Sequence, residues 1–118
     1  MWIILYRSFE NLSWVEDQPD VPEVLPDSRI EVFDFCIDFN NRDAFEADFI
    51  SPVDKLCGAL IDFDEVEFLN ASQCKLLKDW LENKLMGKVN PIFVSVYRKF
   101  LEFVTLAVEF QTGVDIEL

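Results

Sequence analysis

The most regular pattern in the chain is an alternation of apolar and mostly acidic positions in residues 30–39. The alternate apolar positions are Phe33, Phe35, Ile37 and Phe39, and the positions between them are Asp34, Cys36 and Asp38. Successive side chains of a β-strand point to opposite faces, so this period predicts a half-buried strand. The apolar run of residues 2–6, rich in aromatic and β-branched side chains, predicts a second, buried strand.

Weaker patterns occupy the middle and the end of the chain. Residues 60–69 mix apolar and acidic side chains and predict a strand, and the alternation in residues 114–118 predicts a final edge strand. A short helix is expected over residues 41–50, with Asn41 as its cap. The Ser-Pro pair at residues 51–52 predicts the restart of a helical turn, which Gly58 is expected to end.

Two long helices are expected in the second half of the chain. The first spans about residues 70–86, has a leucine-rich face and ends at Gly87. The second spans about residues 91–111, is closed by Gly113, and is apolar around most of its circumference, as a central core helix is. Its polar residues form one narrow stripe, which consists of Ser95, Arg98, Glu102, Thr105 and Glu109.

Together these elements predict a single α+β domain over residues 1–118. In it, a small sheet of three or four strands packs against the two principal C-terminal helices, and the strand order stays open. The length suits one domain. Hydrophobic residues make up 51% of the chain and include 12 Phe, which is enough for a packed interior.

A long proline-containing segment, residues 10–28, separates the first two predicted strands. Its three prolines exclude a helix, and its length exceeds that of most connections in compact domains, which indicates a functional or mobile loop. It carries Trp14 among several carboxylates, a combination typical of binding hot spots. The alternative is that its apolar residues only pack down over the sheet.

Acidic residues are concentrated in the first half of the chain. The whole chain has 23 Asp and Glu against 10 Lys and Arg, a formal net charge of −13. Residues 10–67 contain 17 acidic and 3 basic residues, whereas residues 68–112 contain 4 acidic and 6 basic residues. A field of this sign repels nucleic acid and speeds association with basic partners. The alternative is that the acidity only keeps a phenylalanine-rich protein soluble.

The composition argues against catalysis. The chain has no histidine, so the commonest general base and metal ligand is missing. Its three glycines are too sparse for a phosphate-binding loop, and the acidic run of residues 62–67 lacks the glycine of a calcium loop. Cys36, Cys57 and Cys74 are too far apart for a zinc site and are expected to be small buried hydrophobes. We therefore expect a protein that is not an enzyme, with no catalytic residues, cofactors or metal.

The sequence also predicts a cytoplasmic protein. No basic residue precedes the N-terminal apolar run and no small-residue cleavage site follows it, so the run does not resemble a secretory signal. No window supplies the roughly 18 uncharged apolar residues of a membrane span. Basic residues are not clustered, so neither direct nucleic-acid binding nor membrane binding is expected.

We expect the protein to bind and neutralise a basic protein, as toxin-immunity proteins, antitoxins and nuclease inhibitors do. Complementary charge raises association rates and selects partners, while a few buried aromatic residues hold the complex. The expected partner is a toxin or nuclease whose cationic surface serves a phosphate substrate. The candidate partner-binding residues are Trp14, Glu16, Asp17, Asp20, Glu23, Asp27, Asp34, Asp38, Asp62, Asp64, Glu65 and Glu67.

Two other functions stay open. A phage-type inhibitor or DNA mimic needs regularly spaced acids over a wide surface, whereas here many acids alternate with phenylalanines that the core requires. A self-associating structural subunit would cover its apolar surplus in a homo-oligomer. The sequence identifies neither the partner nor the oligomeric state.

Overall fold

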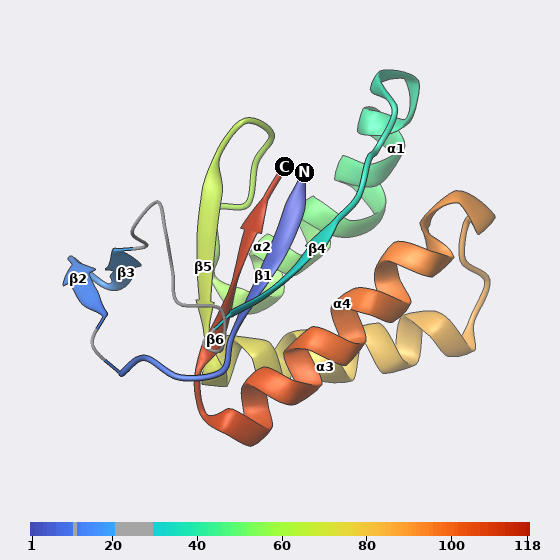
Figure 1. Ribbon diagram of the computed structural model, residues 1–118. Helices are drawn as coiled ribbons and strands as arrows, with labels where there is room; N and C mark the ends of the chain where they lie inside the picture. The colour runs from blue at the N-terminus through green and yellow to red at the C-terminus, as the bar shows by residue number, and fades with distance from the viewer. Residues whose placement is uncertain (11, 21–29) are drawn as a thin grey trace.

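The computed structural model describes residues 1–10, 12–20 and 30–118. Its centre is a four-stranded antiparallel sheet of order β4-β1-β6-β5, with helices on one face and a two-stranded hairpin beside the other (Figure 1). This arrangement confirms the predicted α+β class. The strands of the sheet are β1 (Trp2–Tyr6), β4 (Ile30–Asp34), β5 (Val66–Asn70) and β6 (Gly113–Glu117), and those of the hairpin are β2 (Ser13–Val15) and β3 (Gln18–Asp20).

The first helical region is one continuous stretch with a wider turn in its middle. Its segments are the 3₁₀ turn η1 (Phe39–Asn41), α1 (Arg42–Phe45), the π-turn η2 (Glu46–Ile50) and α2 (Ser51–Cys57). The predicted restart at Ser51 is wrong, because Ser51 has helical dihedrals, with φ −61° and ψ −49°, and the helical stretch continues through it. A π-turn lies there instead, just before Pro52, the residue whose missing N–H disturbs an α-helical ladder. Gly58 ends the stretch in the left-handed conformation at φ 63°, as predicted.

The two principal helices are α3 (Ala71–Met86) and α4 (Pro91–Phe110). Asn70 and Gln73 form a reciprocal capping box at the start of α3, which confirms the predicted boundary. Gln111, with φ 56°, ends α4 in place of the predicted Gly113, which lies in β6. None of the described helices is long and apolar enough to cross a membrane.

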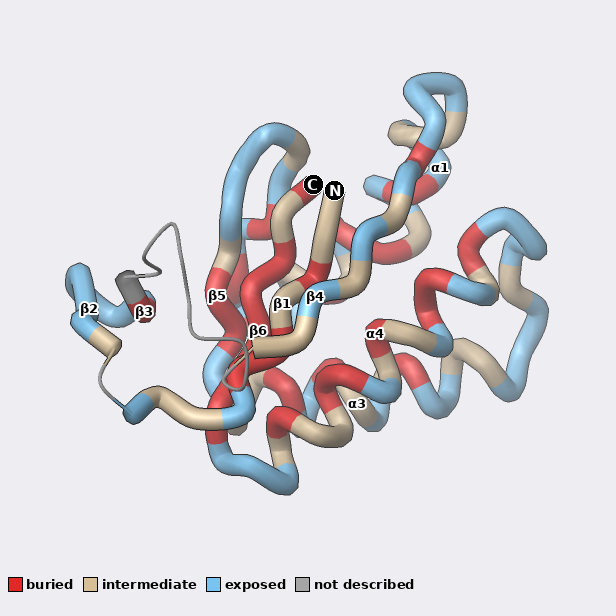
Figure 2. The backbone as a smooth tube through the Cα atoms, viewed as in Figure 1, coloured by how far each residue is buried: buried red, intermediate tan, exposed pale blue. Residues whose placement is uncertain are grey.

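The core lies between the sheet and the helices, where many segments of the tube in Figure 2 are coloured as buried. Its strand residues include Ile3, Leu5, Leu69, Val114 and Ile116. The helices add stacked rings, such as Phe45 and Phe49 with centroids 5.1 Å apart. A polar network closes one side of this core, because the Asp48 carboxylate accepts hydrogen bonds of 2.6 Å from both Tyr97 Oη and Lys84 Nζ.

Several predicted strand boundaries are wrong. Partly or fully buried side chains alternate with exposed ones as far as Ile37, but β4 itself ends at Asp34. Phe39, which was expected on the buried face, is 82% exposed. Residues 60–65 form a loop, and β5 begins only at Val66. β6 lies between β1 and β5 and is a central strand, whereas the sequence predicted an edge strand.

The cysteines divide between core and surface. Cys57 and Cys74 are buried, as predicted, and burial raises the pKa of their thiols to about 11 and about 12. These pKa values keep both thiols protonated and unreactive at neutral pH. Cys36 is exposed, contrary to the prediction, because it follows the end of β4 and lies outside the sheet.

Candidate functional site: the outer face of the sheet

The face of the sheet opposite the helices, here called the outer face, has no basic residue among its described strand positions. The antiparallel register places Trp2 between Asp34 and Glu117, and Ile4 between Val32 and Asp115. The strand residues that share this face by alternation are Trp2, Ile4, Tyr6, Ile30, Val32, Asp34, Val66, Phe68, Asn70, Gly113, Asp115 and Glu117. Aromatic and aliphatic side chains are thus mixed with carboxylates and one amide.

The β2–β3 hairpin covers one end of the outer face. The indole of Trp14 meets Phe9 edge-on at 4.9 Å between centroids and Phe68 at 6.0 Å. Phe9 in turn contacts the ring of Tyr6 at 5.5 Å. Aromatic pairs at these separations favour tilted and edge-on geometries, so this cluster anchors the hairpin to β1 and β5.

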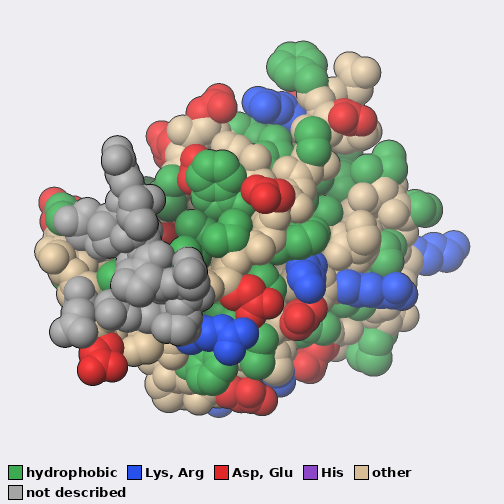
Figure 3. Space-filling model, viewed as in Figure 1, with side chains coloured by type: hydrophobic (Ala, Val, Ile, Leu, Met, Phe, Trp, Pro, Cys, Tyr) green, Lys and Arg blue, Asp and Glu red, His purple; other side chains and the backbone are tan. Residues whose placement is uncertain are grey.

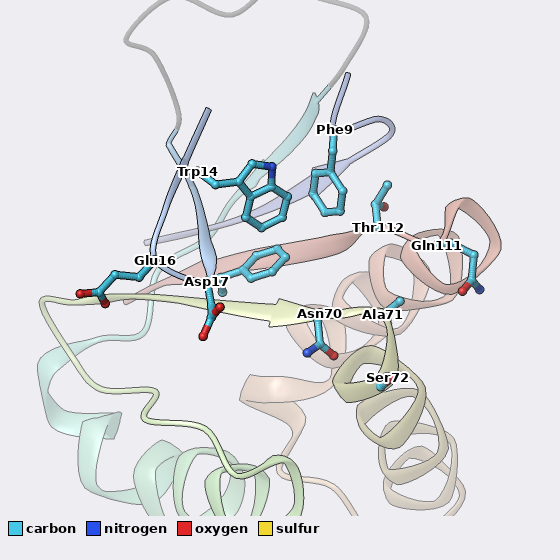
Figure 4. Close-up of a pocket in the computed structure, with 10 residues that line it drawn as sticks. Phe9, Trp14, Glu16, Asp17, Asn70, Ala71, Ser72, Gln111 and Thr112 are labelled. Atoms are coloured by element: carbon cyan, nitrogen blue, oxygen red, sulfur yellow. The ribbon is translucent and has the colours of Figure 1, made fainter. Parts of the chain in front are cut away.

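A cleft of about 490 Å³ opens between the hairpin, the start of α3 and the end of α4 (Figure 4). Trp14 stays 46% exposed beside it, although it packs against two other rings. The lining, here called the aromatic cleft, consists of Phe9, Trp14, Glu16, Asp17, Phe68, Asn70, Ala71, Ser72, Gln111 and Thr112. The described lining therefore combines three aromatic rings and two carboxylates with amide and hydroxyl groups.

Two carboxylates stand at the tip of the hairpin. Glu16 and Asp17 form its two-residue turn, and both side chains are exposed. Glu16 has φ 56°, a left-handed conformation that costs a non-glycine residue about 1–2 kcal/mol. In Figure 4 the Glu16 carboxylate points away from the rings, whereas that of Asp17 lies on the β5 side of the hairpin.

Asp115 is buried at the centre of the outer face. It is 5% exposed, and its Oδ2 accepts a hydrogen bond from Tyr6 Oη. Burial raises the pKa of Asp115 to about 6, the hydrogen bond from Tyr6 opposes this shift, and the negative charges of Glu117 and Glu67 add to it. A carboxyl group at this position changes its charge just below neutral pH.

A second group of acids lies at the end of the sheet where both chain termini meet. Asp34 and Glu117 flank Trp2 there, and Asp64 and Glu65 are tied to Leu118 by backbone hydrogen bonds. Figure 3 shows acidic side chains around apolar ones in this region, whereas most lysine and arginine side chains in that view lie over the helices. We call Asp34, Asp64, Glu65 and Glu117 the acidic end.

No family model matches the chain, and no curated protein or solved structure matches it. The site therefore has to be judged on its own geometry. Within the described residues, no group of three or more Asp, Glu or Cys side chains has an arrangement that would hold a metal ion.

The predicted binding residues fall into four sets. Trp14, Glu16 and Asp17 line the aromatic cleft, and Asp34, Asp64 and Glu65 belong to the acidic end. Three further residues, Glu67, Asp62 and Asp38, lie neither in the aromatic cleft nor at the acidic end. The Glu67 carboxylate accepts a hydrogen bond from the Leu60 amide, and Asp62 Oδ1 accepts one from Phe63 N. Asp38 lies just before η1. Glu23, Asp27 and the side chain of Asp20 lie outside the described residues.

The ion pairs of the described chain involve other carboxylates. The four pairs are Arg7–Glu31, Lys78–Glu82, Lys84–Asp48 and Lys99–Glu102. The carboxylates of the hairpin tip and of the acidic end take part in none of them. Their negative charge is therefore not cancelled by a neighbouring described cation.

Sequence reasoning missed several residues of this face. The alternation predicts Asp115 and Glu117 on the polar side of an edge strand, and no local pattern assigns Phe9 or Phe68 to a site. The alternation of residues 114–118 does indicate that Asp115 and Glu117 share one face of their strand. The central position of β6 then places that face in the middle of the sheet. The contact of Phe9 with Trp14 has no signal in the local sequence, since it depends on how the hairpin folds back.

Proposed function

We propose that this protein is a non-catalytic inhibitor that binds a basic protein through its outer face and neutralises it, as toxin-immunity proteins and nuclease inhibitors do. One observation carries the proposal: every charged side chain among the described strand residues of this face is a carboxylate. A net charge of −13 adds a long-range field of the same sign. Such a field raises the rate of encounter with a cationic surface.

The apolar residues of the outer face favour a protein partner over mimicry of a nucleic acid. Val32 and Val66 are each 48% exposed, and Trp2 is half-buried between two acids. A phosphate track offers no such apolar surface, whereas protein interfaces combine an aromatic or aliphatic centre with a polar rim. A symmetric homodimer through this face would bring carboxylates against carboxylates, which opposes self-association there.

Reversing two charges of the acidic end should weaken partner binding. The partner is first captured on the immobilised protein from a lysate of the source organism, identified, and purified. We expect Asp34→Lys with Glu117→Lys to lower the affinity for it by about tenfold or more at low salt, with the loss mainly in the association rate. Surface plasmon resonance at about 0.05 M and about 0.5 M salt would show the difference shrink as screening increases.

A matched variant controls for net charge alone. Asp43 and Asp79 are exposed on α1 and α3, and their double replacement by lysine changes the total charge by the same amount. This control should bind the partner nearly as well as the wild type at high salt and lose much less at low salt. Equal losses in both double variants, or capture of a partner that is not basic, would contradict the proposed function.

A further inference from the structure

We propose that the aromatic cleft binds one arginine side chain of the basic partner. This inference rests on the proposed function and names the group that is recognised at one end of the outer face. The cleft has three chemically distinct parts: an aromatic wall, a carboxylate lip at the hairpin tip, and a polar floor from the ends of α3 and α4. Each part matches one feature of a guanidinium group.

The aromatic wall offers a surface on which a planar cation can stack. Trp14 meets Phe9 and Phe68 edge to face, and it remains 46% exposed, so part of its indole stays open to a ligand. Phe68 is buried behind it. The faces of aromatic rings attract cations, and tryptophan attracts them most strongly. Arginine is the better match than lysine, because its flat guanidinium stacks on rings while its N–H groups still donate hydrogen bonds in the plane.

The lip and the floor supply acceptors for those N–H groups. Asp17 contributes a carboxylate on the β5 side of the hairpin, whereas the Glu16 carboxylate points away from the rings and adds only to the negative field at the lip. The described lining contains no basic residue. Gln111 donates its Nε2 to Val108 O at 2.6 Å, and this bond does not use its amide oxygen, which is an acceptor. The Thr112 hydroxyl donates to Tyr6 O and retains lone pairs as an acceptor.

Two features oppose a cation, and neither outweighs the carboxylates. The N-terminus of α3 carries a partial positive charge of about half a unit, and the Asn70–Gln73 capping box already uses the Gln73 amide there. Lys75 lines a neighbouring hollow of about 260 Å³ that shares Ser72 and Gln111 with the cleft. The negative charges of Asp17 and Glu16 at the hairpin tip exceed this partial charge, and Lys75 lies outside the cleft lining.

The cleft is also large enough to admit an arginine side chain. Its volume of about 490 Å³ lies in the range of sites that enclose a small ligand. The cleft is therefore large enough for a guanidinium with its three-carbon stem, while the rest of the partner lies across the outer face toward the acidic end.

The inference is tested with N-acetyl-argininamide as the probe. In ¹H–¹⁵N spectra of the full chain, the probe should produce saturable shifts of the Trp14 indole N–H and the Asn70 and Gln111 side-chain amides. The Trp80 indole, on α3 and outside the cleft lining, should not shift. N-acetyl-citrullinamide, which has the same shape without the charge, should cause shifts at least several-fold smaller, and N-acetyl-lysinamide should bind more weakly than the arginine probe.

Substitutions test the contributions of the aromatic wall and the carboxylate lip to binding separately. Trp14→Ala and Asp17→Asn should each weaken binding of the arginine probe several-fold, whereas Trp14→Phe should retain most of it. Asp62→Asn removes the same charge from an exposed loop outside the cleft and should leave binding unchanged. Retained dispersion of the remaining amide signals shows that each variant is folded.

Three outcomes would overturn the inference: equal shifts with the citrulline probe, arginine binding that Trp14→Ala and Asp17→Asn do not alter, or stronger shifts at Ala71 and Ser72 with inorganic phosphate. Preference for the lysine probe would also overturn the assignment of arginine. These failures are distinguishable from failure of the proposed function. If the cleft ignores arginine but charge reversal at Asp34 and Glu117 still weakens partner binding, the outer face remains the interface.

Discussion

Gly113→Ala should destabilise the protein by about 3 kcal/mol or more, or prevent folding altogether. A β-carbon at Gly113 would overlap the carbonyl oxygen of Leu69 and lie 2.6 and 2.7 Å from Cε2 and Cζ of Phe68. The Leu69 carbonyl belongs to β5, the strand paired with β6, so relief of the overlap would separate two strands of the sheet. Urea unfolding at neutral pH measures this loss.

Gly87→Ala is the matched control for this prediction. A β-carbon at Gly87 would meet only the carbonyl oxygen of Lys84, at 3.6 Å, which is an ordinary contact. Its free energy of unfolding should stay within about 1 kcal/mol of the wild type. If Gly113→Ala were as stable as Gly87→Ala, then the close packing of β5 and β6, and with it the placement of the Phe68 ring beneath Trp14, would be wrong.

Asp115→Asn should stabilise the protein above pH 6 and remove part of its pH dependence. The folded-state pKa of Asp115, about 6, exceeds the ordinary value of 3.8, so the folded state binds this proton more tightly than the unfolded state. The resulting stability is complete below about pH 4 and is lost as the pH rises to about 6. A shift of this size corresponds to a loss on the order of 3 kcal/mol.

The measurement compares unfolding free energies of the wild type and Asp115→Asn at several pH values. The asparagine keeps an oxygen that accepts from Tyr6 Oη, so the gain in stability above pH 6 reflects the charge rather than a lost hydrogen bond. Asp34→Asn, on the same face but exposed, should change stability by no more than about 0.5 kcal/mol at any of these pH values. Parallel pH profiles for wild type and Asp115→Asn would contradict the burial of a charged Asp115.

The sequence was sufficient for the helices and for the faces of the strands, because these depend on local periodicity. The span of α3, with its start near residue 70, and the polar stripe of α4 were readable in this way. So was the burial of Phe33, Phe35 and Ile37, even though β4 stops at Asp34. Side-chain alternation persists in an extended chain after strand pairing ends, so it predicts burial better than it predicts hydrogen bonding.

The β2–β3 hairpin and the central position of β6 could not be predicted from local sequence patterns. The prolines of residues 10–28 argue against a helix and a central strand, and the pattern predicts only a loop there. Pro19 nevertheless pairs with Trp14 in a two-stranded hairpin, where a missing N–H is tolerated. The alternation at residues 114–118 was the same for an edge strand and a central one. Only the pairing of β6 with both β1 and β5 brings Asp115 and Glu117 onto a face with Trp2 and Phe68.

The proposed function requires a concentration of negative potential over the outer face, and this potential can be measured without a partner. Paramagnetic relaxation by a cationic and an anionic nitroxide cosolute reports the local potential at each proton. We predict that the cationic probe is most enriched at residues 32–34, at residues 115–117 and at the hairpin tip, and least enriched along the lysine-bearing side of α3. A uniform negative potential, or a maximum over α1 and α2, would contradict the account.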